Sequence, residues 1–350
     1  MNRIENKEEK VKHIGRTYQS NDIIWMAYSG SGIEFSFTGN KCEITITGDS
    51  NARRGCINPA RFGIYMNEVR VVDDIMDQES KSYVVLDSES ERTVTIQIIK
   101  LSETAMSICG VKDIMIAGSD ILPTDKKPYK IEFIGDSITC GYGIDDTSGT
   151  RSFTTETEDV TKAYAYLTAK ELDADYSMVS ISGYGIASGY TTDARDMRQT
   201  IPQYYSKFGF SYTNFDGGKT PSDIVWNHNQ FIPDVIVINL GTNDDSWCKD
   251  FSERQEVYQV GYTEFLKEVR NKNKDANILC VFGMMGDRLY PYIEKAVKEY
   301  TKVTADDKIS TMKFDVQVEE DGYASDFHPS VITNQKAAKR LIERIKSILS

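Results

Sequence analysis

Apolar and polar residues alternate with a period of two along most of the first 120 residues. Such alternation is typical of β-strands that bury one face and leave the other in water. Turn residues separate the runs, and Asn67-Glu68 between two of them predicts a tight turn. The predicted strands are 32–39, 42–48, 61–66, 69–72, 82–86, 93–100 and 111–116. Short strands separated in this way predict an antiparallel sandwich.

From Tyr129 onward the pattern changes to apolar runs separated by segments with helical spacing of apolar residues. The predicted strands are 130–134, 176–181, 234–240, 277–282 and 311–315. The predicted helices are 161–172, 256–272, 290–303 and 333–349. Strands that alternate with helices predict a parallel sheet with helices on both faces.

The change of pattern predicts two domains. Residues 1–122 form the all-β domain, and residues 129–350 form the α/β domain. Residues 123–128 contain two prolines and are the expected linker. Residues 204–231 are aromatic and irregular, and we expect them to form a surface excursion near the functional site.

Charge and composition narrow the function. The net charge is −12, and no Lys/Arg cluster forms a basic stripe, so nucleic acid and anionic membranes are disfavoured as partners. No apolar run is long enough to span a bilayer. The six cysteines show no metal-binding spacing, so no metal is expected. The N-terminus lacks an apolar signal region, which favours a cytoplasmic location, although a secreted protein whose signal had been removed would look the same.

The strongest chemical candidate is Ser137, which follows a buried strand in Gly-Asp-Ser at 135–137. Ligands bind at the carboxyl ends of strands in open α/β sheets, so this serine is a candidate nucleophile. Such a serine needs a base, and the chain has only three histidines. His328 lies in a loop before the last helix and is the candidate; the alternative is a solvent-exposed histidine at a helix start.

Two further loops follow predicted strands. The glycine-rich stretch 180–189 is a strand-to-helix turn or, alternatively, a dinucleotide-binding loop, but the spacing between Gly185 and Gly189 is wrong for the latter. Asn243 follows the third strand and either donates to an oxyanion or only shapes the turn. Serine, glycine, asparagine and histidine would then lie along one edge of the sheet.

These motifs resemble, in order, the four blocks of the SGNH (GDSL) hydrolases: Gly135-Asp136-Ser137, Gly183, Gly241-Thr242-Asn243-Asp244 and Asp326-x-His328-Pro329. The β-rich front half is similar to the jelly-roll domain of carbohydrate esterase family 2. The resemblance implies a jelly roll followed by a flavodoxin-like, five-stranded parallel sheet with helices on both faces.

The resemblance also assigns roles. Ser137 becomes the nucleophile and His328 the general base, while the Ser137 and Gly183 N–H groups and the Asn243 side chain form the oxyanion hole. Those hydrolases usually carry Asp three residues before His, where this chain has Ser325. Either Asp326 or a main-chain carbonyl would then orient His328.

Two aromatic residues, Trp247 and Tyr184, are candidate substrate contacts that could stack on a sugar ring; the alternative for Trp247 is partial burial. The implied activity is a serine O-acetylesterase acting on acetylated plant polysaccharides or oligosaccharides of the mannan, glucomannan or xylan type. A preference for the 6-position and acetyl transfer to another sugar are further expectations. No cofactor or metal is implied, and the oligomeric state is left open.

Two other functions stay open at this stage. One is a lipid or thioester esterase on the same fold, since a fold does not fix a substrate. The other is a non-catalytic carbohydrate-binding protein, in which the β domain binds the glycan. The β domain could equally do no more than pack against the hydrolase domain.

Overall fold

The computed structural model describes residues 1–5 and 7–350, and these form two compact units. Unit 1 contains residues 1–126, 154–158 and 207–226. Unit 2 contains residues 127–153, 159–206 and 227–350. Most of the expected excursion over 204–231 therefore belongs to unit 1, where Phe208 and Phe215 are buried in a cluster with Trp25. Much of this segment lies at the surface, as expected, but its buried aromatic rings anchor it in the core of unit 1.

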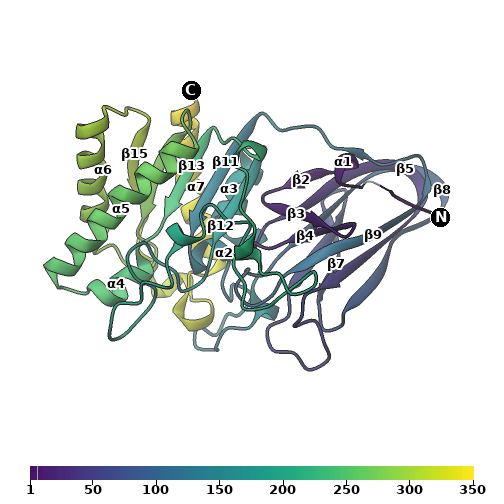
Figure 1. Ribbon diagram of the computed structural model, residues 1–350, viewed down its shortest axis with the longest axis horizontal. Coiled ribbons are helices and arrows are strands. Elements are labelled where there is room, and N and C mark those ends of the chain that lie inside the picture. Colours follow the sequence, from purple (N-terminus) through teal and green to yellow (C-terminus); the bar gives the residue numbers. More distant parts are fainter. Residues whose placement is uncertain (6) are drawn as a thin grey trace. The chain divides into compact units, whose positions relative to one another are not determined.

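Unit 1 is an antiparallel sheet whose strands carry purple to blue colours in Figure 1. The strand order is β3-β4-β9-β5-β8-β6-β7, with β2 and β10 also pairing with β5, and β1 with β9. The strands are β1 (Asn2–Arg3), β2 (Lys12–Ile14), β3 (Thr17–Ser20), β4 (Ile23–Met26), β5 (Gly32–Gly48), β6 (Arg61–Met66), β7 (Val69–Ile75), β8 (Ser80–Lys100), β9 (Cys109–Gly118) and β10 (Leu122–Pro123). A one-turn helix, α1 (Lys7–Lys10), precedes β2.

The alternating sequence explains how this sheet builds a core. Inward-facing residues such as Phe35, Ile44 and Ile96 are fully buried in one cluster, so the sheet curls around a shared interior. The β6–β7 turn at Asn67 and Glu68 has φ of 50° and 67°. Left-handed values at both central residues are what a type I′ hairpin requires. The predicted all-β front domain is confirmed.

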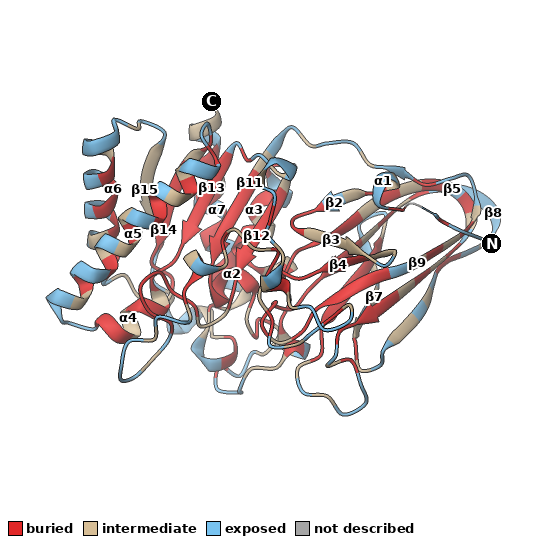
Figure 2. Cartoon of the chain, in the orientation of Figure 1, coloured by how far each residue is buried: buried red, intermediate tan, exposed pale blue. Residues whose placement is uncertain are grey.

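Unit 2 is a five-stranded parallel sheet in the order β12-β11-β13-β14-β15, as in flavodoxin-like folds. Its strands are almost entirely buried except for β15, as Figure 2 shows for the central strands. The strands are β11 (Tyr129–Gly135), β12 (Ala174–Ser180), β13 (Val235–Asn239), β14 (Asn277–Phe282) and β15 (Ile309–Lys313). The predicted parallel sheet is confirmed.

Helices complete unit 2. They are α2 (Ser137–Cys140), α3 (Tyr164–Glu171), α4 (Thr242–Cys248), α5 (Ser252–Lys272), α6 (Tyr290–Thr304) and α7 (Val331–Leu349). Helix α3 packs with α7, and α5 packs with α6. Among the described residues, no helix combines the length and the apolar character needed to cross a bilayer.

Strand register decides where the functional loops begin. Gly135 at the end of β11 is paired with Ser180 of β12 and with Asn239 of β13. The segments that follow these three residues therefore leave the sheet at the same edge. This edge carries the Gly-Asp-Ser turn, the glycine-rich loop and the Gly-Thr-Asn-Asp segment.

Candidate active site

The nucleophile candidate lies in a tight turn between β11 and α2. Asp136 caps α2, because its carboxylate accepts the Ile138 N–H at 3.0 Å. Gly141 ends the helix with φ of 80°. Ser137 is thus the first residue of the helix, and its Oγ lies 2.9 Å from Nε2 of His328. The fold thus brings together two residues that are 191 positions apart in the sequence.

The base candidate is His328, which follows a tight turn over Ser325–Phe327. Its Nδ1–H donates to the Ser325 carbonyl at 3.0 Å, which leaves Nε2 as the acceptor for the Ser137 hydroxyl. Burial lowers the pKa of His328 to about 4. The ring is therefore neutral at pH 7, the form that a general base needs.

Asp326 does not make the Nδ1 contact. Its carboxylate instead accepts the Tyr142 hydroxyl at 2.9 Å and the Phe153 N–H at 3.2 Å. Of the two alternatives that the sequence left open, the main-chain carbonyl of Ser325 is the one that contacts the ring in this structure.

The two other oxyanion-hole candidates lie on the neighbouring loops. Gly183, after β12, has φ of 83°, and a Cβ there would meet only Gln199 Oε1, at 3.9 Å. Asn243 lies in the first turn of α4 and is 5% exposed. Its Nδ2 donates to the Tyr184 carbonyl at 3.0 Å and lies 3.3 Å from Oδ2 of Asp136. The Asn243 amide therefore reaches the residue that caps the nucleophile turn.

Asp244 has a structural role that was not predicted from the sequence. Its buried carboxylate accepts three successive backbone N–H groups of the glycine-rich loop, those of Ile186, Ala187 and Ser188, at 2.9, 2.6 and 2.9 Å. Burial raises its pKa to about 6, although these hydrogen bonds oppose the rise. The carboxylate ties the loop that contains Gly183 to the helix that contains Asn243. The sequence feature that could have pointed to this role of Asp244 is its position next to Asn243.

The two candidate sugar contacts lie inside the protein. Trp247 is 9% exposed, and the guanidinium groups of Arg195 and Arg254 lie 5.2 and 5.5 Å from its ring centroid. Tyr184 is 3% exposed and packs edge-on against Tyr204. Both side chains are thus largely buried, and their contact with a sugar stays a prediction.

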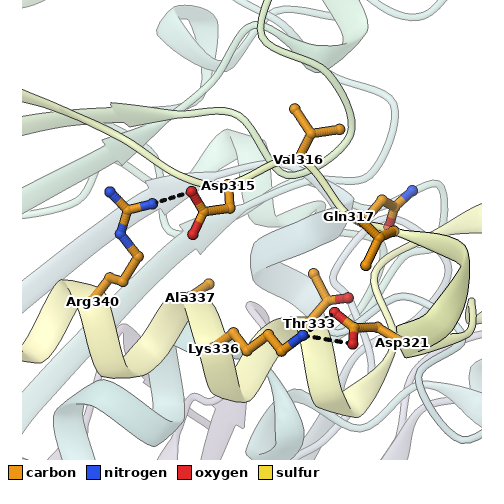
Figure 3. Close-up of a pocket in the computed structure, with 9 residues that line it drawn as sticks. Asp315, Val316, Gln317, Asp321, Thr333, Lys336, Ala337 and Arg340 are labelled. Atoms are coloured by element: carbon orange, nitrogen blue, oxygen red, sulfur yellow. Dashed lines mark hydrogen bonds and ion pairs between the residues drawn. The ribbon is translucent and has the colours of Figure 1, made fainter.

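The segment before His328 is also held from the side of α7. A cavity of about 150 Å³ lies between residues 315–321 and this helix. Figure 3 shows Lys336 paired to Asp321 and Arg340 paired to Asp315 at its wall. Gln317 in the cavity wall donates through Nε2 to the Phe327 carbonyl at 2.9 Å. Within residues 1–5 and 7–350, no three His, Cys, Asp or Glu side chains are grouped to hold a metal ion.

Comparison with known proteins matches two family models to different parts of the chain. The sequence model of the GDSL-like Lipase/Acylhydrolase family matches residues 133–336. The chain belongs to this family. A second model, Carbohydrate esterase 2 N-terminal, matches residues 13–124. The resemblance to the GDSL hydrolases is thereby confirmed for the α/β part of the chain, and the resemblance to carbohydrate esterase family 2 for the β-rich front half.

Three relatives illustrate the match. The chain is 30% identical to Cellulase/esterase CelE of Acetivibrio thermocellus over 92% of its own length, and it spans only 37% of that protein. It is 27% identical to an Acetylxylan esterase / glucomannan deacetylase of Cellvibrio japonicus, over 79% of this chain and 76% of that one. The solved structure of a family two carbohydrate esterase from Clostridium thermocellum in complex with cellohexaose superimposes with a TM-score of 0.84. That match has 27% identity and covers 97% of this chain and 99% of the other.

Proposed function

We propose that this acylhydrolase is a serine esterase that removes O-acetyl groups from plant polysaccharides or their oligosaccharides, of the xylan, glucomannan or mannan type. The observation that carries the proposal is the contact of 2.9 Å between Ser137 Oγ and His328 Nε2. The names of the relatives, an acetylxylan esterase / glucomannan deacetylase and a cellulase/esterase, support the substrate class.

The proposed reaction begins with the neutral His328 ring. Nε2 takes the Ser137 proton while Oγ attacks the acetyl carbonyl carbon, and the carbonyl π electrons move to oxygen. The imidazolium that forms keeps its Nδ1–H bond to the Ser325 carbonyl. His328 then gives the proton to the sugar oxygen as the carbon–oxygen bond breaks. Water, or a second sugar hydroxyl in a transfer reaction, removes the acetyl group by the same steps in reverse.

The oxyanion would receive hydrogen bonds from the Ser137 and Gly183 N–H groups and from the Asn243 amide. The amide has two acceptors in the structure, so one N–H must leave its acceptor when substrate binds. The longer of the two hydrogen bonds, 3.3 Å to Asp136, is the one that the oxyanion would replace. Burial raises the pKa of Asp136 to about 7, so its carboxyl group is partly neutral at neutral pH and a weaker acceptor.

The decisive experiment measures acetate release from acetylated xylan and glucomannan oligosaccharides. Ser137→Ala should lower kcat by at least about a thousandfold, because the covalent step is lost. Ser347→Ala, near the end of α7, is the matched control and should retain the parent rate. A Ser137→Ala chain that keeps a tenth or more of the parent activity, as an order of magnitude, excludes the serine mechanism.

Two further arms address the substrate. The acetylated oligosaccharides are compared with long-chain p-nitrophenyl esters and acyl thioesters at equal concentrations. We expect higher kcat/KM on the acetylated sugars, and NMR of the products shows whether the 6-position is lost first. Faster turnover of long acyl chains would favour a lipid or thioester esterase. Glycan binding without release of acetate by the parent chain would favour a binding protein.

A further inference from the structure

The His328 imidazole is one member of a stack of three rings. The Tyr142 ring lies nearly parallel to it, with centroids 4.0 Å apart and an interplanar angle of 23°. Phe153 stacks on the same tyrosine at 4.2 Å and 22°. Two rings that are parallel to a third at such distances would overlap if they shared one of its faces. Tyr142 is therefore sandwiched between Phe153 and His328.

Tyr142 also holds the backbone that precedes His328. Asp326 and Phe327 have φ of 50° and 58°, in the left-handed region that residues other than glycine seldom adopt. Such conformations persist only where the surroundings impose them. The Tyr142 hydroxyl and the Phe153 N–H both donate to Oδ2 of Asp326 and fix this turn from outside.

The geometry at Nδ1 explains why such support is needed. In a Ser-His-Asp triad, a buried carboxylate holds the imidazole in its productive orientation and stabilises the imidazolium. Here Nδ1–H donates to a neutral carbonyl, that of Ser325. The second hydrogen bond of the ring joins Nε2 to Ser137, and neither bond covers the face of the ring. Tyr142 does cover that face, and an aromatic face also favours the cationic form of the ring.

The same residue is attached to the nucleophile turn. The Tyr142 N–H donates to the Ser137 carbonyl at 3.2 Å. Gly141 and Gly143 on either side have φ of 80° and 55°, which lets the chain turn sharply at this point. Tyr142 thus joins the segment of the nucleophile to the loop of the base.

We propose that Tyr142 is a positioning residue that sets His328 against Ser137 and takes over the orienting part that a carboxylate plays in other serine hydrolases. The inference rests on the proposed esterase function. The ring-on-ring contact supplies the plane of the imidazole, and the hydroxyl contact with Asp326 supplies the position of the loop.

The kinetic test uses Tyr142→Leu, which removes the stack, and Tyr142→Phe, which keeps it and removes the hydroxyl. For p-nitrophenyl acetate we expect Tyr142→Leu to lower kcat by about tenfold or more with KM within about twofold, because misorientation affects the transition state. Tyr142→Phe should keep more of kcat than Tyr142→Leu, and its remaining loss measures the hydroxyl contact with Asp326. Tyr166→Leu is the control: Tyr166 contacts Tyr176 edge-on in another part of unit 2 and should leave kcat unchanged.

A spectroscopic readout does not depend on turnover. The chain has three histidines, so the proton signals of the His328 ring are assigned by comparison with His328→Ala. Stacking on Tyr142 shields these protons, and Tyr142→Leu should move their signals downfield while Tyr142→Phe leaves them near the parent position. Tyr142→Met carries the same expectation if Tyr142→Leu does not fold.

The outcomes separate the two proposals. An unchanged kcat, or unchanged His328 signals, in a folded Tyr142→Leu chain would overturn the positioning role. Activity that survives Ser137→Ala would overturn the esterase function, and the ring signals would still decide whether Tyr142 stacks on His328 in solution.

Discussion

At the scale of single residues, burial acts on an acid and on a base in opposite directions. It raises the pKa of Asp136 to about 7 and lowers that of His328 to about 4. Both shifts favour the neutral form. The proposed site therefore combines a neutral imidazole with a carboxyl group whose negative charge is reduced, next to Asn243, the proposed oxyanion donor.

The first prediction concerns the acid limb of the pH profile. Protonated His328 cannot accept the Ser137 proton, so kcat/KM should be lost as pH falls through the pKa of the free enzyme, which is about 4. The measurement is kcat/KM for p-nitrophenyl acetate against pH. An acid limb with its midpoint at the ordinary histidine value, about 6.5, would contradict the burial argument.

Acid unfolding is the control for that profile. Because the pKa of His328 is lower in the folded state than in the unfolded chain, its contribution to stability is complete above about pH 6.5 and declines as pH falls toward 4. Circular dichroism at each pH separates loss of structure from loss of the base.

At the scale of elements, the loop after α2 and the loop before α7 touch. Gly143 has φ of 55°, and a Cβ added to it would overlap the side chain of Ser325. Ser325 is the residue whose carbonyl contacts Nδ1 of His328. The absence of a side chain at 143 is therefore what allows this carbonyl to reach its place.

The prediction that follows is loss of activity in Gly143→Ala. The added methyl group should displace Ser325 and lower kcat/KM by about tenfold or more, since misplacement of a catalytic group by an ångström has effects of this size. Gly322→Ala is the matched control, because Gly322 also has a left-handed φ, of 70°, but a Cβ there meets nothing within 4 Å. Equal activity of the two variants would contradict the argument that the clash with Ser325 displaces its carbonyl.

Periodicity predicted the regular elements of unit 2 well, because buried parallel strands and amphipathic helices have clear patterns. It did not predict α4, whose residues Thr-Asn-Asp-Asp-Ser-Trp-Cys have no apolar repeat. It also predicted two strands, 32–39 and 42–48, where the structure has the single strand β5. The register shifts at 39–42 interrupt the alternation of apolar and polar residues as a turn would. The β5 strand nevertheless continues through the shift.

For the site, motif order predicted that Ser137 and His328 belong together. Contacts made by backbone groups were not predictable in the same way, since any residue type can supply a carbonyl or an N–H. The hydrogen bond of the Ser325 carbonyl and the three N–H groups on Asp244 are of this kind. Tyr142 was missed because a tyrosine between two glycines has the composition of an ordinary loop.

At the scale of the whole molecule, unit 1 is not a continuous stretch of chain. The buried Arg16 guanidinium donates to the Lys207 carbonyl at 2.7 Å and lies 5.2 Å from the centroid of the Trp226 ring. Both partners come from the segment 207–226, which follows β12 in sequence. A charge this deeply buried is costly unless its partners are present.

We therefore predict that a fragment of residues 1–126 does not fold cooperatively by itself. It lacks the contacts of Arg16 with Lys207 and Trp226, and it lacks the rings of Phe208 and Phe215 that pack with Trp25. The measurement is thermal unfolding by circular dichroism and tryptophan fluorescence, with the full chain as the control. A sharp transition in the isolated fragment, close to that of the full chain, would show that the later segments are dispensable.

The division of unit 1 between distant parts of the chain has a consequence for how its domains can recombine in evolution. A recombination joint placed in residues 123–128 would transfer a β part without Phe208, Phe215 and Trp226, which complete its interior. The protein that receives the β part would have an incomplete hydrophobic core. The protein that loses it would keep aromatic residues that have no core to pack against. Recombination during evolution should therefore transfer the two units together, as one continuous stretch of sequence.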